Sequence, residues 1–243
     1  MTNEYSSSLP EPALSSPLHP RGVGTKFTAD GSVMRFPGNT IICHLPVDSD
    51  LRPVLFHLYK SLERSKDRGL YTLLPPDSWH MTVFEGTVDA KREPGFWPSD
   101  LSLEATLAEC TSHLERKLDR FDIQDSGDFV MQVSGWLPLV DGIGLTLRSK
   151  ELGQEIRLRD LRDRLSQALQ IRHPEHERYV FHLSIAYLLR ELTPSQLDVL
   201  SETLQQAITS MPSSFTLGTP EYCEFDDMFE FRRRSYLRKL DTP

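Results

Sequence analysis

Four segments of the chain repeat apolar residues at three- and four-residue steps, the spacing of a helix with one buried face. The fourth segment has the clearest start, because Thr193 and Gln196 form a capping box with Pro194 at the first helical position. The apolar spacing predicts helices over residues 51–62, 103–121, 152–169 and 194–208.

Short apolar or alternating runs lie between these helices and end at Pro, Gly or Asp, as strands do. An Asp30-Gly31 pair between two short apolar pieces also predicts a hairpin within residues 26–36. The mixture of strands and helices predicts an α+β fold. The predicted strands cover residues 41–45, 70–74, 79–87, 129–139, 142–148, 179–188, 214–217, 222–225 and a stretch through 229–237.

Composition divides the chain into two parts. The first 20 residues are rich in Ser and Pro and poor in large apolar side chains, so they bury too little surface to offset their ordering entropy. We expect residues 1–24 to form a flexible arm and residues 25–243 to form a single domain, a size that suits one large domain or two joined lobes.

Charge and cysteine content narrow the classes of partner. The chain has 35 acidic and 27 basic residues, a net charge of −8, which argues against extended nucleic-acid binding but leaves room for a small anionic ligand. Cys43, Cys110 and Cys223 lie far apart in sequence, and their spacing predicts buried thiols rather than disulfides or metal ligands. We expect a cytoplasmic monomer without a membrane segment, since no apolar run approaches the length of a spanning helix.

One short pattern occurs twice: an aromatic residue, His, an apolar residue, a hydroxyl residue and two apolar residues. It occupies residues 79–84 (WHMTVF) and 181–186 (FHLSIA), both within predicted strands. The chain has eight histidines, and the other six lie outside this pattern. Two chance matches are therefore less plausible than a repeated site.

Strand geometry gives the repeat a chemical interpretation. Alternation places His80 and Thr82 on one face, with Phe84, and the same rule pairs His182 with Ser184. If both faces border one cleft, a neutral imidazole can take a proton from attacking water while a protonated one donates to the leaving oxygen. The hydroxyls can donate hydrogen bonds to the phosphate oxygens, so the sequence predicts phosphodiester chemistry without a metal ion.

The two motifs, His80-Met81-Thr82-Val83 and its counterpart over residues 182–185, resemble those of the two-histidine (2H) phosphoesterase superfamily. The resemblance implies two pseudo-twofold-related lobes, with antiparallel sheets around a central cleft and helices outside. It also implies metal-independent hydrolysis of 2′,3′-cyclic phosphates or 2′-5′ linked substrates without a cofactor. By position, His80 and His182 become the acid–base pair, and Thr82 and Ser184 become ligands of the phosphate oxygens.

Two further residues are candidates for substrate binding. His44 lies in the first central strand and could face the cleft, although a buried structural role is equally consistent with its position. Tyr187 stands where many members of the superfamily have a basic residue. Strict alternation turns Tyr187 away from His182 unless the strand contains a bulge.

Other local signals have simpler interpretations. His173 and His176 have the spacing of a metal-ligand pair, but Pro174 interrupts the helix, so we expect a solvated charged loop. The basic run 232–239 is typical of an exposed strand. The insert at residues 91–100 is long enough to cover a cleft.

We therefore expect an enzyme that acts on a small nucleotide-like or RNA-terminal phosphate. The alternative is a module of the same fold that binds nucleotides or RNA ends without turnover. Two proton-transfer groups favour the enzyme, since binding alone does not need them. Ligation at RNA ends would use the same residues, and the sequence does not separate it from hydrolysis.

Overall fold

The computed structural model describes residues 20–124 and 128–240. Residues 1–19 of the expected arm lie outside the described residues. Residues 20–24 are described, and Arg21 attaches them to the rest of the protein through an ion pair with Asp141.

Strands of the described residues form one antiparallel sheet in the order β7-β4-β5-β6-β3-β1-β8-β9, with β2 paired to β6. The two strands that carry the repeated motif, β3 and β6, are direct neighbours at the centre. The strands are β1 Gly38–His44, β2 Tyr71–Leu73, β3 His80–Val88, β4 Val130–Trp136, β5 Gly142–Ser149, β6 His182–Leu188, β7 Phe215–Thr216, β8 Glu221–Phe225 and β9 Arg232–Tyr236.

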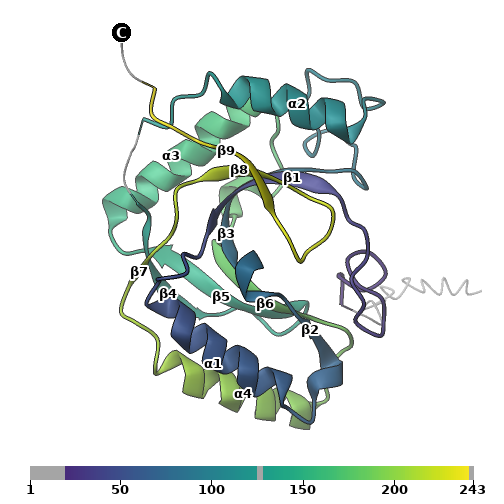
Figure 1. The fold of residues 1–243 in the computed structure, drawn as a ribbon, viewed down its shortest axis with the longest axis vertical. Coiled ribbons are helices and arrows are strands. Elements are labelled where there is room, and N and C mark those ends of the chain that lie inside the picture. Colours follow the sequence, from purple (N-terminus) through teal and green to yellow (C-terminus); the bar gives the residue numbers. More distant parts are fainter. Residues whose placement is uncertain (1–19, 125–127, 241–243) are drawn as a thin grey trace, which may run out of the picture.

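In the part of the chain that the structure describes, four α-helices pack in two pairs on opposite sides of the molecule (Figure 1). Helix α2 packs against α3 near β8 and β9, and α1 packs against α4 below β4 to β6 (Figure 1). Helix α1 follows β1 in sequence but packs with α4, so the first and last of these helices form one pair. The expected α+β fold is confirmed. The helices are α1 Leu51–Glu63, α2 Leu107–Leu118, α3 Leu152–Leu169 and α4 Pro194–Ile208.

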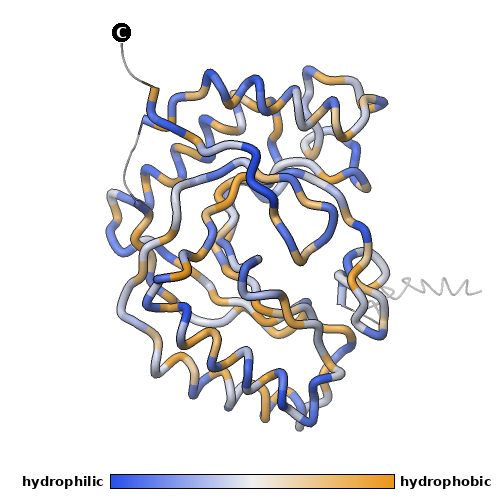
Figure 2. The backbone as a smooth tube through the Cα atoms, viewed as in Figure 1, coloured by the Kyte–Doolittle hydropathy of each residue, from blue (hydrophilic) through white to orange (hydrophobic). Residues whose placement is uncertain are grey.

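The helices bury one face each, and hydrophobic and hydrophilic positions alternate along them (Figure 2). The predicted capping box of Thr193 and Gln196 is present at α4. A second capping box at Thr106 starts α2 four residues after Leu103, which the sequence placed in the helix. Leu152 and Ile156 were wrongly assigned to the buried stripe of α3, since their side chains are 76% and 60% exposed.

The predicted hairpin lies between the N-terminal segment and the centre of the sheet. Phe27 pairs with Val33 in an isolated antiparallel bridge, and Gly31 has a φ of +90° that favours glycine at the turn. Phe27 is fully buried, with its ring 5.1 Å from that of Tyr187 in β6. Aromatic packing therefore holds this hairpin against one of the motif strands.

The structure also tests the predictions for the cysteines, the basic run and membrane segments. The three cysteines are free and buried, as expected. The arginines of β9 lie on an exposed strand, as expected, and pair with acidic neighbours, so much of the charge of this basic run is neutralised locally. These pairs are Arg232 with Asp226, Arg233 with Glu221, and Arg234 with Glu115 and Glu224. In the described residues, no helix has the length and apolar character needed to cross a membrane.

Candidate active site

A cavity of about 440 Å³ opens on the face shared by β3 and β6. Its floor carries all four polar residues of the repeated motif, His80, Thr82, His182 and Ser184. The wall also includes residues of β1, Leu74 after β2, and residues near 26–36, 91–96, 173–179 and 225–231. The volume suits a small ligand of nucleotide size.

The pairing of β3 with β6 fixes how the motif residues face one another. Met81 is the antiparallel partner of Leu183, and both are fully buried on the opposite face. This register sets Thr82 across from His182 and places His80 diagonally to His182. Diagonal neighbours in a sheet are about 7–8 Å apart, which leaves space for a phosphate between the two imidazoles.

Both motif histidines are held in the same tautomer. Nδ1 of His80 lies 2.7 Å from the carbonyl oxygen of Ser78, and Nδ1 of His182 lies 2.8 Å from that of Val180. A carbonyl oxygen only accepts hydrogen bonds, so Nδ1 carries the proton in both rings. Nε2 is therefore the nitrogen that remains for proton exchange with a ligand.

The environment of His80 favours the neutral imidazole. Burial lowers the pKa of His80 to about 3, although the hydrogen bond to the Ser78 carbonyl acts in the opposite direction. The ring of Phe231 lies 4.3 Å from the imidazole and provides part of this apolar environment. A neutral His80 in the unliganded protein suits a proton acceptor.

Each motif strand contains a bulge at the same place. The register with the neighbouring strand shifts at Val83 in β3 and at Ile185 in β6. The bulge reverses the alternation, so Phe84 is 1% exposed in the core instead of sharing the face of His80 as predicted. In β6 the same shift brings Tyr187 into the cavity wall with His182, against strict alternation.

Different groups anchor the two bulges. The carbonyl oxygen of Val83 accepts a hydrogen bond of 2.6 Å from the buried guanidinium of Arg162. The carbonyl oxygen of Ile185 accepts one of 2.8 Å from the backbone N–H of Leu74. Arg162 is 1% exposed and lies 4.0 Å from the centre of the Tyr179 ring, so the guanidinium is part of the core.

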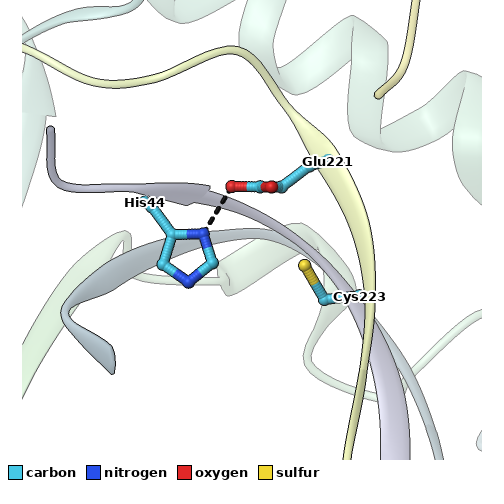
Figure 3. A group of neighbouring side chains, drawn as sticks. All are labelled: His44, Glu221 and Cys223. Carbon is cyan, nitrogen blue, oxygen red and sulfur yellow. Dashed lines mark hydrogen bonds and ion pairs between the residues drawn. The ribbon is translucent and has the colours of Figure 1, made fainter. Parts of the chain in front are cut away.

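His44 lies beside His80 but is not part of the cavity wall. The centres of the two imidazoles are 6.2 Å apart, and Nδ1 of His44 forms a short hydrogen bond with Glu221 (Figure 3). Arg233 donates to the other carboxylate oxygen of Glu221 at 3.1 Å. Burial raises the pKa of an isolated carboxyl, but these two partners hold the pKa of Glu221 below its usual range.

The side chains around His44 could also be considered as ligands of a metal ion. Donor atoms of His44, Glu221 and Cys223 lie within 4.8 Å of one another. However, both carboxylate oxygens of Glu221 are engaged, Arg233 adds a positive charge, and burial strongly raises the pKa of the Cys223 thiol. These contacts fit a hydrogen-bonded support for His44 better than a cation site.

The structure corrects the expectation for the loop after α3. His176 is 4% exposed and its Nε2 lies 3.0 Å from Asp163, so this residue is not solvated. His173 reaches the cavity wall, with Nε2 3.1 Å from the carbonyl oxygen of Gly86. This contact places the loop against the C-terminal part of β3.

Three charged residues of the cavity wall were not identified from the sequence. Glu85 occupies the same place after its bulge as Tyr187 does, five residues beyond the motif histidine, so a longer comparison of the repeats would have found it. Lys91 comes from the insert, as does Phe96. Lys26 donates a hydrogen bond of 3.0 Å to the Tyr187 hydroxyl and comes from the hairpin, where no periodic pattern marks it.

A family model described as 2H-phosphodiest, a domain of unknown function (DUF1868), matches residues 26–140, which include the first motif. The chain is also similar to the crystal structure of a conserved protein of unknown function from Agrobacterium tumefaciens strain C58. The two are 26% identical, with 90% of this chain and 93% of that chain covered and a TM-score of 0.82. No curated protein matches the chain.

Proposed function

We propose that the chain, which belongs to the 2H phosphoesterase superfamily, hydrolyses a 2′,3′-cyclic phosphate of a nucleotide or RNA end. His80 and His182 act as the acid–base pair. The observation that carries the proposal is the matched placement of two motif histidines, in one tautomer, on the floor of one cavity.

The proposed reaction gives each of the two motif histidines one proton transfer. Nε2 of neutral His80 takes a proton from water, whose oxygen forms a bond to phosphorus. The bond from phosphorus to O3′ breaks, and protonated His182 donates its Nε2 proton to O3′, leaving a 2′-phosphate. The carbonyl oxygens at Nδ1 hold both rings in the tautomer that leaves Nε2 for the proton transfers.

The hydroxyls of Thr82 and Ser184 have a separate role. Each lies across the strand pair from a motif histidine and borders the same cavity. Their O–H groups donate hydrogen bonds to the nonbridging phosphate oxygens, where negative charge increases during the reaction. All the proton transfers therefore use protein side chains, and the proposed reaction needs no metal ion.

The test is product formation in EDTA from a panel of nucleoside 2′,3′-cyclic phosphates, RNA ending in a cyclic phosphate, and 2′-5′ linked dinucleotides. We expect turnover of the cyclic phosphates and a 2′-phosphate product, identified by phosphorus NMR. His57→Ala, on the exposed face of α1, is the matched control for histidine removal.

A strict requirement for a divalent metal ion would contradict the proposal. So would a 3′-phosphate product, because the bond to O2′ would then be the one that breaks. Saturable nucleotide binding without turnover on any member of the panel would instead support the recognition module of the same fold.

A further inference from the structure

Lys26 places a cation in the cavity wall next to the second motif strand. Its ammonium donates a hydrogen bond of 3.0 Å to the Tyr187 hydroxyl and lies 4.9 Å from the centre of the Tyr187 ring. The centre of the Phe36 ring lies 5.3 Å from the same ammonium. An ammonium has three N–H donors, so this hydroxyl leaves others for a ligand in the cavity.

This ammonium has no carboxylate partner within ion-pair distance among the described residues. The charge of Lys26 contributes to lowering the pKa of Asp141, but this carboxylate is already paired with Arg21 at 2.5 Å. By contrast, the other lysine of the wall, Lys91, pairs with Glu93 at 3.3 Å. Lys26 is half-buried and bordered by two aromatic rings, which makes it the cation better suited to an anionic ligand.

The position along β6 shows which part of a ligand would reach Lys26. Tyr187 follows Ser184 by three residues, a length of about 10 Å in an extended strand and less across the bulge. A phosphate bound between the two motif histidines is therefore too far from Lys26 to contact its ammonium as well. The second place fits another anionic group of the same molecule.

We propose that Lys26 and Tyr187 bind a second phosphate of the substrate, the 5′-phosphate of the nucleotide that carries the cyclic phosphate. This inference rests on the proposed function. It identifies the substrate as an RNA end or a 5′-phosphorylated nucleotide rather than a nucleoside cyclic phosphate without a second anion. Lys26 and Tyr187 determine specificity and take no part in proton transfer.

The first experiment compares kcat/KM in EDTA for adenosine 2′,3′-cyclic phosphate and for the same compound with a 5′-phosphate. We expect the 5′-phosphorylated substrate to be preferred roughly tenfold, the value of one charge-assisted hydrogen bond. A dinucleotide ending in a cyclic phosphate separates the two sources of the anion, because its 5′-phosphate is a diester. A stronger preference for the dinucleotide indicates an RNA end.

Variants assign the preference to the lysine. Lys26→Met should remove the preference, and Lys26→Arg should keep most of it, since the positive charge and N–H donors remain. Lys91→Met is the matched control and should keep the preference. Tyr187→Phe should weaken it less than Lys26→Met, because the ring and the ammonium stay in place.

A binding measurement makes the result independent of turnover. Adenosine 2′,5′-bisphosphate and adenosine 2′-phosphate are titrated calorimetrically into the wild-type protein and the Lys26→Met variant. We expect the bisphosphate to bind roughly tenfold more tightly to the wild-type protein and equally to the variant. Equal binding of both compounds by the wild-type protein would overturn the inference.

The two experiments separate the inference from the proposed function. Turnover without a 5′-phosphate preference, or a preference that Lys26→Met does not change, overturns the second phosphate site and leaves the phosphodiesterase standing. Tighter binding of the bisphosphate, lost in Lys26→Met, without turnover of any cyclic phosphate supports the site and overturns the hydrolase.

Discussion

The two motif strands, β3 and β6, have the same chemical arrangement up to the bulge and differ beyond it. Each has a histidine with Nδ1 bonded to the carbonyl two residues earlier, then a hydroxyl residue, then a bulge. After the bulge, β3 presents Glu85 to the cavity and β6 presents Tyr187 beside Lys26. The repeated part suits a symmetric reaction centre, and the part that differs suits an asymmetric substrate.

The largest expected effect tests the repeated part. His80→Ala and His182→Ala should each reduce kcat about 10³-fold, because each removes one proton-transfer group. The double variant should be little worse than either single one, since the two groups act as a unit. Steady-state hydrolysis of a cyclic phosphate measures this, with His57→Ala as control. Full activity in either single variant would refute the paired mechanism.

A smaller effect concerns the hydroxyls across the strand pair. Thr82→Val and Ser184→Ala should each reduce kcat about 10²-fold, because each removes a donor to the nonbridging oxygens. Thr82→Ser retains the hydroxyl and should keep most of the activity. Equal losses in Thr82→Val and Thr82→Ser would show that packing, not hydrogen bonding, explains the effect.

The bulge in β3 is held by the side chain of Arg162, whereas the bulge in β6 is held by a backbone N–H, so a substitution can remove only the first anchor. Arg162→Met leaves the carbonyl of Val83 without its donor and should lower the free energy of unfolding by about 2 kcal/mol. Arg116→Met, on the exposed side of α2, is the matched control and should have little effect. Urea denaturation measures both. An Arg162→Met variant as stable as the wild-type protein would contradict a role for the guanidinium at the bulge.

The smallest expected effect is on the pH dependence of stability, through the protonation of His80. Its pKa in the folded protein is about 3, below the ordinary 6.5, so between these values the unfolded chain binds a proton that the folded protein does not. The folded state should therefore lose stability as the pH falls below 6.5. His80→Asn should make thermal stability less dependent on pH in this range, and an unchanged dependence would argue against the low pKa.

The sequence predicted those parts of the structure that follow from local spacing. Leu51, Leu55, Leu58 and Leu62 mark the buried face of α1, and each is at most 2% exposed. The same rule assigned Leu152 and Ile156 to a buried face of α3, where Arg162 takes a core position instead. A charged residue in the core depends on distant partners, here Val83 and Tyr179, which spacing does not show.

The candidate site was predictable only where it repeats. The structure brings His80, Thr82, His182 and Ser184 to one cavity, whereas strict alternation misplaced Phe84 because a bulge has no marker in this sequence. The contribution of Lys26 depends on contact with a residue 161 positions away. Such contacts come from the pairing of distant segments and are absent from local patterns.

The central claim is that His80 accepts and His182 donates a proton, and a change of leaving group tests it most directly. A nucleoside 2′,3′-cyclic phosphate with sulfur in place of O3′ releases a thiolate, which needs no proton from an acid. The account predicts that His182→Ala loses about 10³-fold on the oxygen substrate but regains most of its rate on the sulfur substrate, while His80→Ala stays inactive on both. Equal impairment of His182→Ala on both substrates would contradict the assignment.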